Sequence, residues 1–358
     1  LLVDILPLDQ LAHRKMLGFL GGTQRIDVFK LARSCRTFVS AFVANAVTED
    51  ISVDWCTLRE FKRLAEAEDL YLGLATPLEA LYQEWDSDHS IGSFRLIYQW
   101  FTFISNVNIL SLDLSEKNLS EYKLLESQMS TWQYEEKVVE GIAEILTDWL
   151  QQFSLNDFSP NHGPGAIASE KGKLGSRIKF GQMKTDLRLD YFIARLPQSN
   201  LPYTAAPLPS GLVRRNEIVF VPKKMDKNRV ISKEPASLAY FQQGMQHALV
   251  ACIEKTDGLR GRIQLSNQKA SQDAAWEGSL YGKFATLDLS NASDSVTNSL
   301  VKRVFRHPDV RRGLWCTRSV EAQLPNGERV ALAKFAPMGS SVCFPIETLI
   351  FAACCELS

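Results

Sequence analysis

Two aspartates, Asp288 and Asp294, share the segment Ala285-Thr-Leu-Asp-Leu-Ser-Asn-Ala-Ser-Asp-Ser-Val296. Asp288 ends a short apolar run, a pattern typical of a buried strand that brings a carboxylate to the rim of a sheet. Asp294 begins a stretch with helical spacing of apolar residues, namely Val296, Leu300, Val301, Val304 and Phe305. Carboxylates at a strand end and a helix start suit a site for a hard cation and a polar substrate. The alternative is a helix N-cap and a solvated turn residue.

Two further segments have complementary chemistry. Residues 221–235 are basic, and Lys223, Lys224 and Arg229 lie in them. The segment Met338-Gly-Ser-Ser341 predicts a small flexible loop with hydroxyl groups. Phosphoryl transfer needs cations for a triphosphate, carboxylates for Mg²⁺ and a polar loop that positions a nucleotide. The three segments together therefore indicate nucleotide chemistry.

The elements that would position these residues follow from local patterns. The first ~150 residues have mainly helical periodicity, and a loop rich in turn formers follows at 159–166. A short buried strand is expected at 217–222, and two strands at 319–324 and 328–335 are joined by Pro325-Asn-Gly-Glu328, a strong hairpin signal. A helix is expected from Phe344 to Cys355, with Phe344, Leu349 and Ile350 in the core. This order predicts an α+β fold.

The composition excludes several classes of protein. With 45% hydrophobic and 23% charged residues, the sequence is that of an ordinary globular chain, and no apolar run reaches the length of a membrane span. Seven cysteines without a Cys-x-x-Cys pair favour reduced, mostly buried thiols over disulfides or a zinc ribbon. The net charge is −1, yet basic residues cluster at 171–188 and 214–233. Either cluster is a groove for a polyanion or a solvated face.

The order and content of these segments closely resemble the replicases of single-stranded RNA phages, the levivirus-type RNA-dependent RNA polymerases. The resemblance covers Phe220 to Leu357 and includes Gln264-Leu-Ser-Asn-Gln-Lys-Ala, Asp288-Leu-Ser-x-Ala-Ser-Asp-Ser, Leu324-Pro-x-Gly, and Met338-Gly followed by Phe344-x-x-Glu-x-Leu-Ile-Phe351. The loop His162-Gly-Pro-Gly-Ala166 is similar to a loop of the same proteins.

The resemblance implies a role for each matched residue. Asp288 would bind catalytic Mg²⁺ of a two-metal site, and Asp294 would recognise the ribose 2′-OH. Lys223 and Arg229, with Lys224 as a further candidate, would bind the incoming triphosphate and RNA. Gly339, Ser340 and Ser341 would sense the templating pair and the ribose. For Lys227 and Lys233, the sequence does not decide between such a binding role and a position on the solvated surface.

The resemblance also implies an architecture and partners. It predicts a right-hand polymerase with a helical region at 1–150, fingers at 151–283 and an incomplete palm at 284–358. The partners would be an RNA template, ribonucleoside triphosphates and host translation factors, in the cytoplasm of a bacterial host and without a membrane. The acidic region before Ser90 is either a contact for such a factor or a solvated surface.

Alternatives remain beside this interpretation. A mitovirus- or narnavirus-type polymerase shares similar motifs, whereas a reverse transcriptase would place a bulky aromatic residue near the ribose. From another class, the chain could be a non-catalytic RNA-binding protein that uses its basic clusters. A helical interaction protein would leave the hairpin and the glycine loop unexplained.

One departure from the family pattern gives a testable prediction. The Gly-Asp-Asp motif of the family is absent, so we interpret the chain as the amino-terminal and central portion of a polymerase without its thumb. A lone Asp288 would bind Mg²⁺ weakly, because this cation is held by carboxylates together with substrate phosphates. We therefore expect the purified 358-residue protein not to polymerise. Nucleotide incorporation with RNA template, ribonucleoside triphosphates and Mg²⁺ would contradict this expectation.

Overall fold

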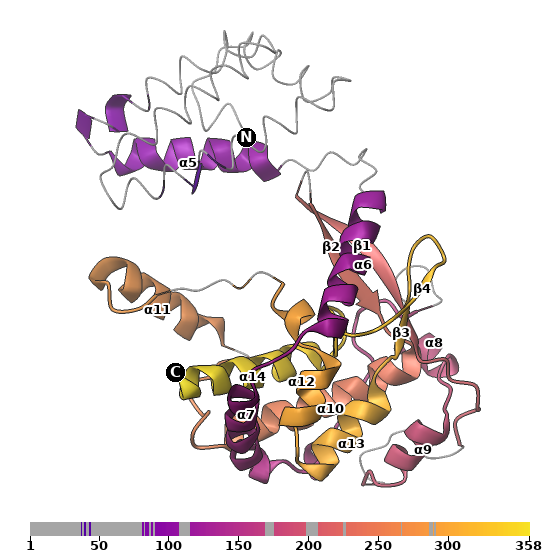
Figure 1. Ribbon diagram of the computed structural model, residues 1–358. Coiled ribbons are helices and arrows are strands. Elements are labelled where there is room, and N and C mark those ends of the chain that lie inside the picture. The colour runs from indigo at the N-terminus through magenta and orange to yellow at the C-terminus, as the bar shows by residue number, and fades with distance from the viewer. Residues whose placement is uncertain are drawn as a thin grey trace. The chain divides into compact units, whose positions relative to one another are not determined.

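The computed structural model describes residues 91–106, 115–168, 175–197, 207–224, 227–265, 267–285, 289 and 291–358, with isolated positions between 37 and 90. The chain divides into two compact units, one of residues 1–114 and 222–229, the other of 115–221 and 230–358 (Figure 1). In the first unit the described helix is α5, Ile91–Asn106. The predicted strand, hairpin and glycine loop lie mainly in the second unit.

The second unit contains helices and short 3-10 turns that precede and follow its strands. These elements are α6 (Ser115–Thr131), α7 (Glu136–Trp149), η1 (Leu150–Gln152), η2 (Leu155–Asp157), α8 (Ser176–Gly181), α9 (Leu187–Ile193), α10 (Ala236–Lys255), α11 (Gln268–Tyr281), η4 (Ser293–Ser295), α12 (Asn298–Val304), α13 (Pro308–Thr317) and α14 (Cys343–Leu357).

Helix α10 lies at the centre of this unit. It packs against α13, α14, α8 and the turns η1 and η2, while α7 packs against α12 and α14. Because α10 has neighbours on several sides, apolar residues such as Tyr240, Phe241 and Ile253 are buried around its circumference. Helix α7 instead presents one apolar stripe, which includes Val139, Ile142 and Leu146. The helices thus share one continuous apolar core.

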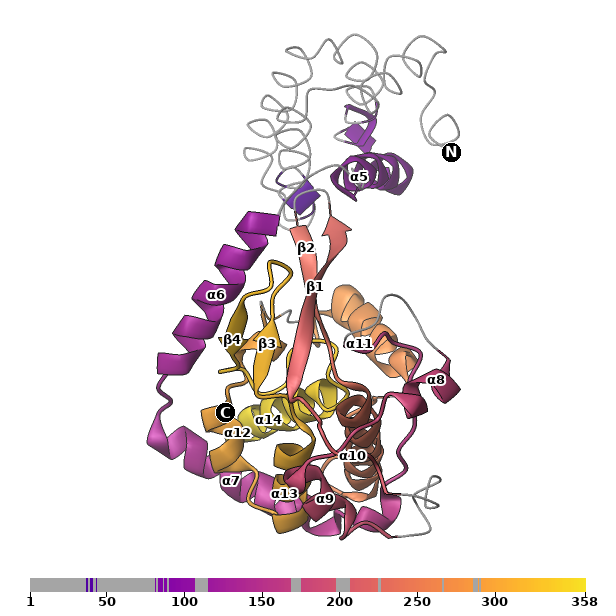
Figure 2. The same cartoon turned by 90° about the vertical axis from the view of Figure 1, so that its right-hand side faces the viewer.

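A small sheet lies beside this helical core, with strands β1 (Arg215–Lys224), β2 (Lys227–Lys233), β3 (Glu321–Gln323) and β4 (Arg329–Ala331). The strand order is β2-β1-β3-β4, with β1 parallel and β4 antiparallel to β3. Helix α6 runs along one face (Figure 2), where Tyr122 joins a second apolar cluster with Ile218, Ala322 and Leu332. This cluster connects α6 to β1 and to the hairpin of β3 and β4.

Several expectations about elements are confirmed. The hairpin forms as β3 and β4, although its strands are shorter than predicted, and Gly327 in the turn has φ +85°. The helix after the glycine loop is α14. The predicted strand at 217–222 lies within β1, where Ile218 is buried but Val221 is exposed. Phe344 was predicted to lie in the core and is 57% exposed, because the buried face of α14 instead contains Ile346, Leu349 and Ile350. The division at 150 and 283 remains a prediction.

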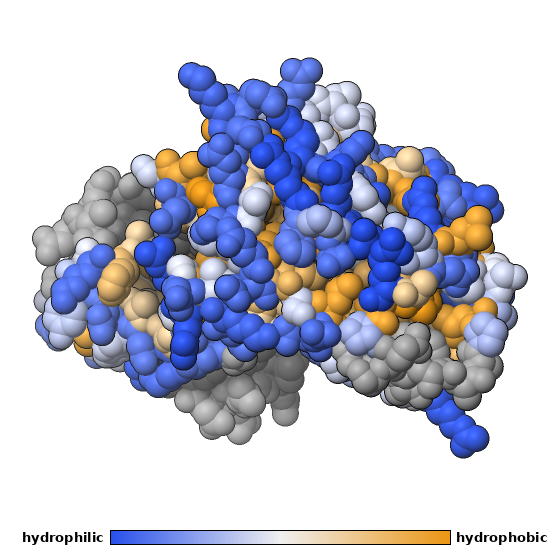
Figure 3. Space-filling model, turned by 90° about the horizontal axis from the view of Figure 1, so that it is seen from below, coloured by the Kyte–Doolittle hydropathy of each residue, from blue (hydrophilic) through white to orange (hydrophobic). Residues whose placement is uncertain are grey.

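The surface agrees with the composition. On the face shown in Figure 3, the apolar patches of the described residues are separated by hydrophilic side chains. No described helix combines the length and apolar character required to traverse a bilayer. Among the described cysteines, Cys252 and Cys316 are buried and free, whereas Cys354 and Cys355 are free and exposed.

An ion pair between the buried Arg214, which directly precedes β1, and the partly buried Asp186 connects this strand to the neighbouring loops. The Arg214 Nε and Nη2 donate to Asp186 at 2.6 and 2.8 Å, and its Nη1 donates to the carbonyls of Cys316 and Arg318. Asp186 also caps α9 by accepting from the Leu189 amide. Although burial alone would raise the pKa of Asp186, the hydrogen bonds from Arg214 and Leu189 hold this pKa below its ordinary value.

We expect Arg214→Met to lower the free energy of unfolding by about 3 kcal/mol, since it leaves Asp186 and two carbonyls without their donor. Lys255→Met is the matched control, because Lys255 is half exposed and pairs with Asp157 at 2.6 Å, a contact worth about 0–1 kcal/mol. Asp186 stabilises the fold above its ordinary pKa, and this contribution is lost as pH falls through its lowered pKa. Urea denaturation should therefore show that the free energies of unfolding of the parent protein and of Arg214→Met approach each other in acid. A difference between them that does not change with pH would contradict this role of the ion pair.

Candidate active site

Asp288 itself lies outside the described residues. The described residues that precede it, 283–285, form no strand, and Phe284 is 56% exposed. The buried strand predicted before Asp288 therefore does not include these residues. Neither the position of the Asp288 carboxylate nor its neighbours can be compared with the prediction, and its role as a metal ligand stays a prediction.

Asp294 lies in the turn η4, between residue 289 and helix α12. Asn291 begins this turn with φ 54°, a left-handed conformation that asparagine tolerates better than most side chains, and its carbonyl accepts from the Ser295 amide at 3.0 Å. The prediction that Asp294 could cap the following helix is wrong. Helix α12 begins at Asn298, and its cap is Thr297, whose Oγ1 accepts from the Leu300 amide at 3.1 Å. The Asp294 carboxylate is therefore available for another contact.

That contact is with Lys334, a residue that the sequence did not single out. The Lys334 Nζ lies 3.1 Å from Asp294 Oδ1 and 3.5 Å from Glu126 Oε1. The lysine side chain is 1% exposed, that of Glu126 is 3% and that of Asp294 is 23%. The ammonium group also lies 4.1 Å from the ring centroid of Tyr122. A buried cation is thus surrounded by two carboxylates and an aromatic ring.

The backbone around Lys334 fixes the same arrangement. Thr297 and Lys334 form an antiparallel bridge, in which the Phe335 amide donates to the Val296 carbonyl at 2.8 Å. Glu126 Oε2 accepts from the Ala333 amide at 2.7 Å. Glu126 therefore joins α6 to the segment that carries Lys334, and this segment pairs directly with the residues that follow Asp294.

Two glutamines of α10 form hydrogen bonds with the predicted loop at 339–341. Gln242 Oε1 accepts from Ser340 Oγ at 3.0 Å and from the Ser341 amide at 3.3 Å. Gln243 Nε2 donates to Ser341 Oγ at 2.8 Å. Ser340 is almost fully buried, whereas the backbone carbonyl of Met338 accepts from the Ser232 amide of β2 at 2.7 Å. Both serines predicted to contact a nucleotide therefore also have structural partners.

Gly339 is restricted in two independent ways. Its φ is +114°, which side-chain-bearing residues rarely adopt. In addition, a Cβ atom at this position would lie 2.1 Å from the Ser232 carbonyl oxygen. The glycine is needed for the close approach of the loop to β2. This close approach to β2 is a structural reason for the glycine that does not depend on a nucleotide.

The Asp294 turn and the glycine loop meet at the start of α14. The turn η4 packs against α14, which begins two residues after Ser341. Burial, together with the charges of Glu347 and Asp294, raises the pKa of Cys343 to about 12. Burial and the charge of Asp294 likewise raise the pKa of Glu347. The Asp294 turn and the 339–341 loop are therefore brought together, and the loop also contacts Ser232 of the basic segment 221–235.

The third predicted segment belongs largely to the other compact unit. Lys223 in β1 and Arg229 in β2 both have exposed side chains, and their role in binding a triphosphate or RNA stays a prediction. The side chains of Lys224 and Lys227 lie outside the described part. Lys233, which was open between a functional and a solvated role, pairs with Glu217 at 2.5 Å in the second unit.

The basic cluster at 171–188 is not simply a charged surface. Lys179 is 2% exposed, and its Nζ donates to the carbonyls of Gly163 and Gly165 at 2.5 and 2.6 Å. The predicted His162-Gly-Pro-Gly loop is thereby anchored to α8. His162 packs against the rings of Phe180 and Tyr240, and burial with the nearby Lys179 charge lowers its pKa to about 4.

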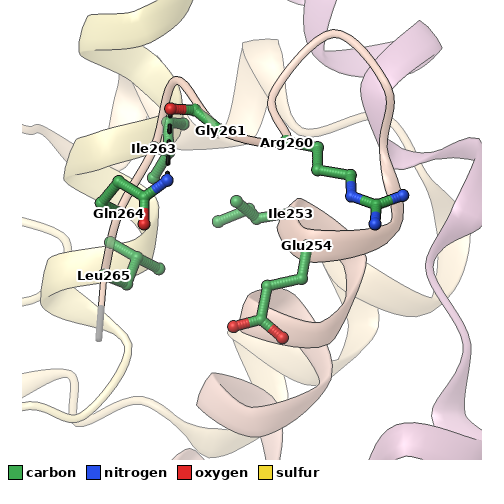
Figure 4. A pocket seen from close by; sticks show the side chains of 7 residues that line it. All are labelled: Ile253, Glu254, Arg260, Gly261, Ile263, Gln264 and Leu265. Atoms are coloured by element: carbon green, nitrogen blue, oxygen red, sulfur yellow. Dashed lines mark hydrogen bonds between the residues drawn. The ribbon is translucent and has the colours of Figure 1, made fainter. Parts of the chain in front are cut away.

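A cavity of about 310 Å³ lies at the end of α10 (Figure 4). It is lined by Ile253 and Glu254 of this helix and by the loop that contains Gly261 and Gln264, and Gln264 Nε2 donates to the Gly261 carbonyl at 3.2 Å. Gln264 and Leu265 begin the predicted motif before α11. The lining contains one carboxylate and one guanidinium group, from Glu254 and Arg260, and so gives no strong preference for an anion or a cation.

The described residues include no group of three or more His, Cys, Asp or Glu side chains arranged to hold a metal ion. Asp294 and Glu347 are close enough to influence each other electrostatically, but Asp294 already pairs with Lys334. The donor set of the described part therefore does not form a metal site by itself. Asp288, the predicted Mg²⁺ ligand, lies outside the described residues, so the metal site stays a prediction.

Sequence reasoning missed Lys334, Glu126, Gln242 and Gln243. A lysine within an apolar run, Ala331-Leu-Ala-Lys-Phe-Ala336, is a signal that could have indicated a buried cation with carboxylate partners. The two glutamines lie on a helix whose other residues are largely apolar, which is a comparable signal. Glu126 offers no local signal, because α6 has a predominantly polar sequence.

Comparison with known proteins identifies relatives of part of this chain. Residues 204–357 match the family described as RNA replicase, beta-chain. The RNA-directed RNA polymerase subunit beta of Enterobacteria phage SP is 39% identical over 147 residues, which are 40% of this chain and 24% of that protein. The corresponding subunit of Escherichia virus Qbeta is 37% identical over 38% of this chain and 22% of its own length. The RNA-directed RNA polymerase beta chain of Escherichia phage MS2 is 35% identical over 40% of this chain and 25% of its own length.

These matches confirm the resemblance seen in the motifs and extend it upstream to residue 204. The matched residues include β1, β2, the Asp294 turn, Lys334 and the glycine loop. The chain spans about a quarter of the length of the curated relatives that it matches.

The geometry of Gly339 predicts a specific defect on substitution. We expect Gly339→Ala to lower the free energy of unfolding by about 2–5 kcal/mol, through the left-handed φ and the overlap with Ser232. Gly327→Ala is the matched control, since Gly327 has φ +85° but no atom within 4 Å of an added Cβ, so only about 1–2 kcal/mol is expected. Urea denaturation of both variants measures the difference, and equal losses would contradict the close approach.

Proposed function

We propose that this chain contributes to an RNA-directed RNA polymerase that copies an RNA template from ribonucleoside triphosphates. The relationship of residues 204–357 to the RNA replicase beta-chain carries the proposal. The relatives named above are RNA-directed RNA polymerase beta subunits of phages. The structure adds a mixed α+β fold in which Asp294 and the 339–341 loop meet at α14. These features suit a palm, with β1 and β2 as part of the fingers.

In this proposal each segment has a chemical role. Lys223 and Arg229 carry exposed cationic groups that would bind the triphosphate, with Lys224 as a further candidate. Asp294 would accept a hydrogen bond from the ribose 2′-OH. Gly339 would let the loop approach the nucleotide closely, and Ser340 and Ser341 would keep it in place through their bonds to Gln242 and Gln243.

Mg²⁺ would be held by Asp288, with additional ligands from elsewhere in the polymerase and from substrate phosphates. When bound, it would activate the attacking 3′-hydroxyl and stabilise the leaving pyrophosphate. The polymerase would act in the cytoplasm of a bacterial host, with host translation factors as its additional partners.

The competing function is RNA binding without catalysis, which the exposed Lys223 and Arg229 would also permit. Substitutions in the complete polymerase chain that carries these residues separate the two. Asp288→Asn should reduce nucleotide incorporation by about 10³-fold or more, since a metal ligand acts in the transition state, and should leave RNA affinity nearly unchanged.

The reciprocal control is charge reversal at Lys223 and Arg229, which should weaken RNA or triphosphate binding and reduce its dependence on salt. Filter binding and single-turnover incorporation measure the two properties separately. Asp288→Asn with normal synthesis would refute the catalytic assignment. Equal loss of RNA binding and synthesis would instead indicate that Asp288 has a structural role.

A further inference from the structure

Lys334 is a buried charge for which the proposed function gives no role. It is 1% exposed and lies opposite Asp294, whose carboxylate is its partner on the solvent side. On the other side the ammonium meets Glu126 of α6, which is itself 3% exposed. Burial of an ammonium group costs several kcal/mol unless charges and hydrogen bonds compensate for it. The fold therefore maintains this cation with partners from two separate segments, the turn η4 and helix α6.

The geometry assigns one carboxylate oxygen of Asp294 to Lys334. The Nζ–Oδ1 distance is 3.1 Å, and the Asp294 side chain retains 23% exposure. A carboxylate has more acceptor positions than one ammonium contact occupies, so the remaining oxygen can accept from a hydroxyl group. Without its partner, the side chain of Asp294 could rotate about its terminal bonds.

Glu126 and Tyr122 hold the lysine in place. Glu126 Oε2 accepts from the amides of Ala333 and Lys334 at 2.7 and 3.3 Å, while its Oε1 lies 3.5 Å from the ammonium. Tyr122 covers the ammonium with its ring at 4.1 Å. Burial, followed by the charge of Glu126, raises the pKa of Tyr122, so this residue remains a neutral phenol beside the two carboxylates. Lys334 thus has little freedom to move away from Asp294.

We propose that Lys334 is a positioning residue that orients Asp294 for selection of a ribonucleotide over a deoxyribonucleotide. This inference rests on the proposed function, because it requires Asp294 to meet the sugar of an incoming nucleoside triphosphate. Lys334 does not touch the nucleotide. It fixes the acceptor that the 2′-hydroxyl needs, and Glu126 keeps Lys334 itself at the required place.

The test is nucleotide discrimination in the complete polymerase chain that carries these residues. Single-turnover incorporation of ATP and 2′-deoxyATP opposite the same template base gives kcat/KM for each nucleotide. We expect Lys334→Met to lower the ratio of these two values by about tenfold or more, equivalent to about 1.4 kcal/mol. The change should arise mainly from a higher KM for ATP, since the acceptor for the 2′-hydroxyl is lost while the dATP reaction does not use it.

Two comparisons separate positioning from a loss of folding. Lys179→Met removes another buried lysine, one that anchors the 163–165 loop, and should leave the ATP/dATP ratio unchanged even if it lowers stability. Glu126→Gln preserves an acceptor for the two amides but removes the charge beside Lys334, and should shift the ratio in the same direction by a smaller factor. If Lys334→Met does not fold, the ATP/dATP ratio of Glu126→Gln tests the positioning role in its place.

A double substitution gives the decisive result. In an Asp294→Ala background, Lys334→Met should produce no further change in the ratio, because Lys334 acts through Asp294. An unchanged ratio in both Lys334→Met and Glu126→Gln, with an active parent enzyme, overturns the positioning role alone. Additive effects of Asp294→Ala and Lys334→Met also overturn it. A folded parent that incorporates no nucleotide overturns the proposed function, and this inference with it.

Discussion

The burial of one ammonium group constrains much of the second unit. The Lys334 ammonium lies in the interior beside Glu126 and Asp294, and the fold must keep both carboxylates near it, since an unpaired buried cation is strongly destabilising. This requirement connects α6, the η4 turn and the segment after the hairpin, which are distant in the sequence. The backbone bridge between Thr297 and Lys334 strengthens the same connection with hydrogen bonds that do not depend on charge. The electrostatic and backbone contacts therefore define a single arrangement, and a shift of any one segment would disturb both of the others.

Neutral hydrogen bonds organise the neighbouring glycine loop. Gln242 joins Ser340 to the Thr317 carbonyl at the end of α13, so the loop is connected through α10 to the core. Gly339 then permits the backbone to approach β2 without a side chain in between. An amide side chain can donate and accept at once, and this suits a loop that contains hydroxyl groups and unpaired amides. The loop and the Asp294 turn are thus fixed by different chemistry, although both adjoin the beginning of α14.

The sequence predicted the elements that depend on local patterns. The hairpin follows from Asn326 and Gly327, and α14 from the apolar run after the glycine loop. It did not predict the cap of α12, because Asp294 and Thr297 are both suitable cap residues and only tertiary contacts decide between them. It also placed Phe344 in the core, since α14 is apolar on most of its surface and periodicity cannot then identify its buried face. The sequence did not predict the roles of Lys334 and Glu126, because these roles come from a contact between residues that are far apart in the chain.

The pairing of Asp294 with Lys334 also bears on how two nearby aspartates could have different roles. A carboxylate beside an ammonium group has part of its charge compensated, which lowers its attraction for a divalent cation relative to an unpaired carboxylate at the same distance. Asp288 lies before the turn and Asp294 within it, so a single segment can supply a metal ligand and a hydrogen-bond acceptor without making them equivalent. In the proposed polymerase, Lys334 would create this difference. The specificity of the second carboxylate would then depend on a residue that follows the hairpin rather than on the aspartate motif itself.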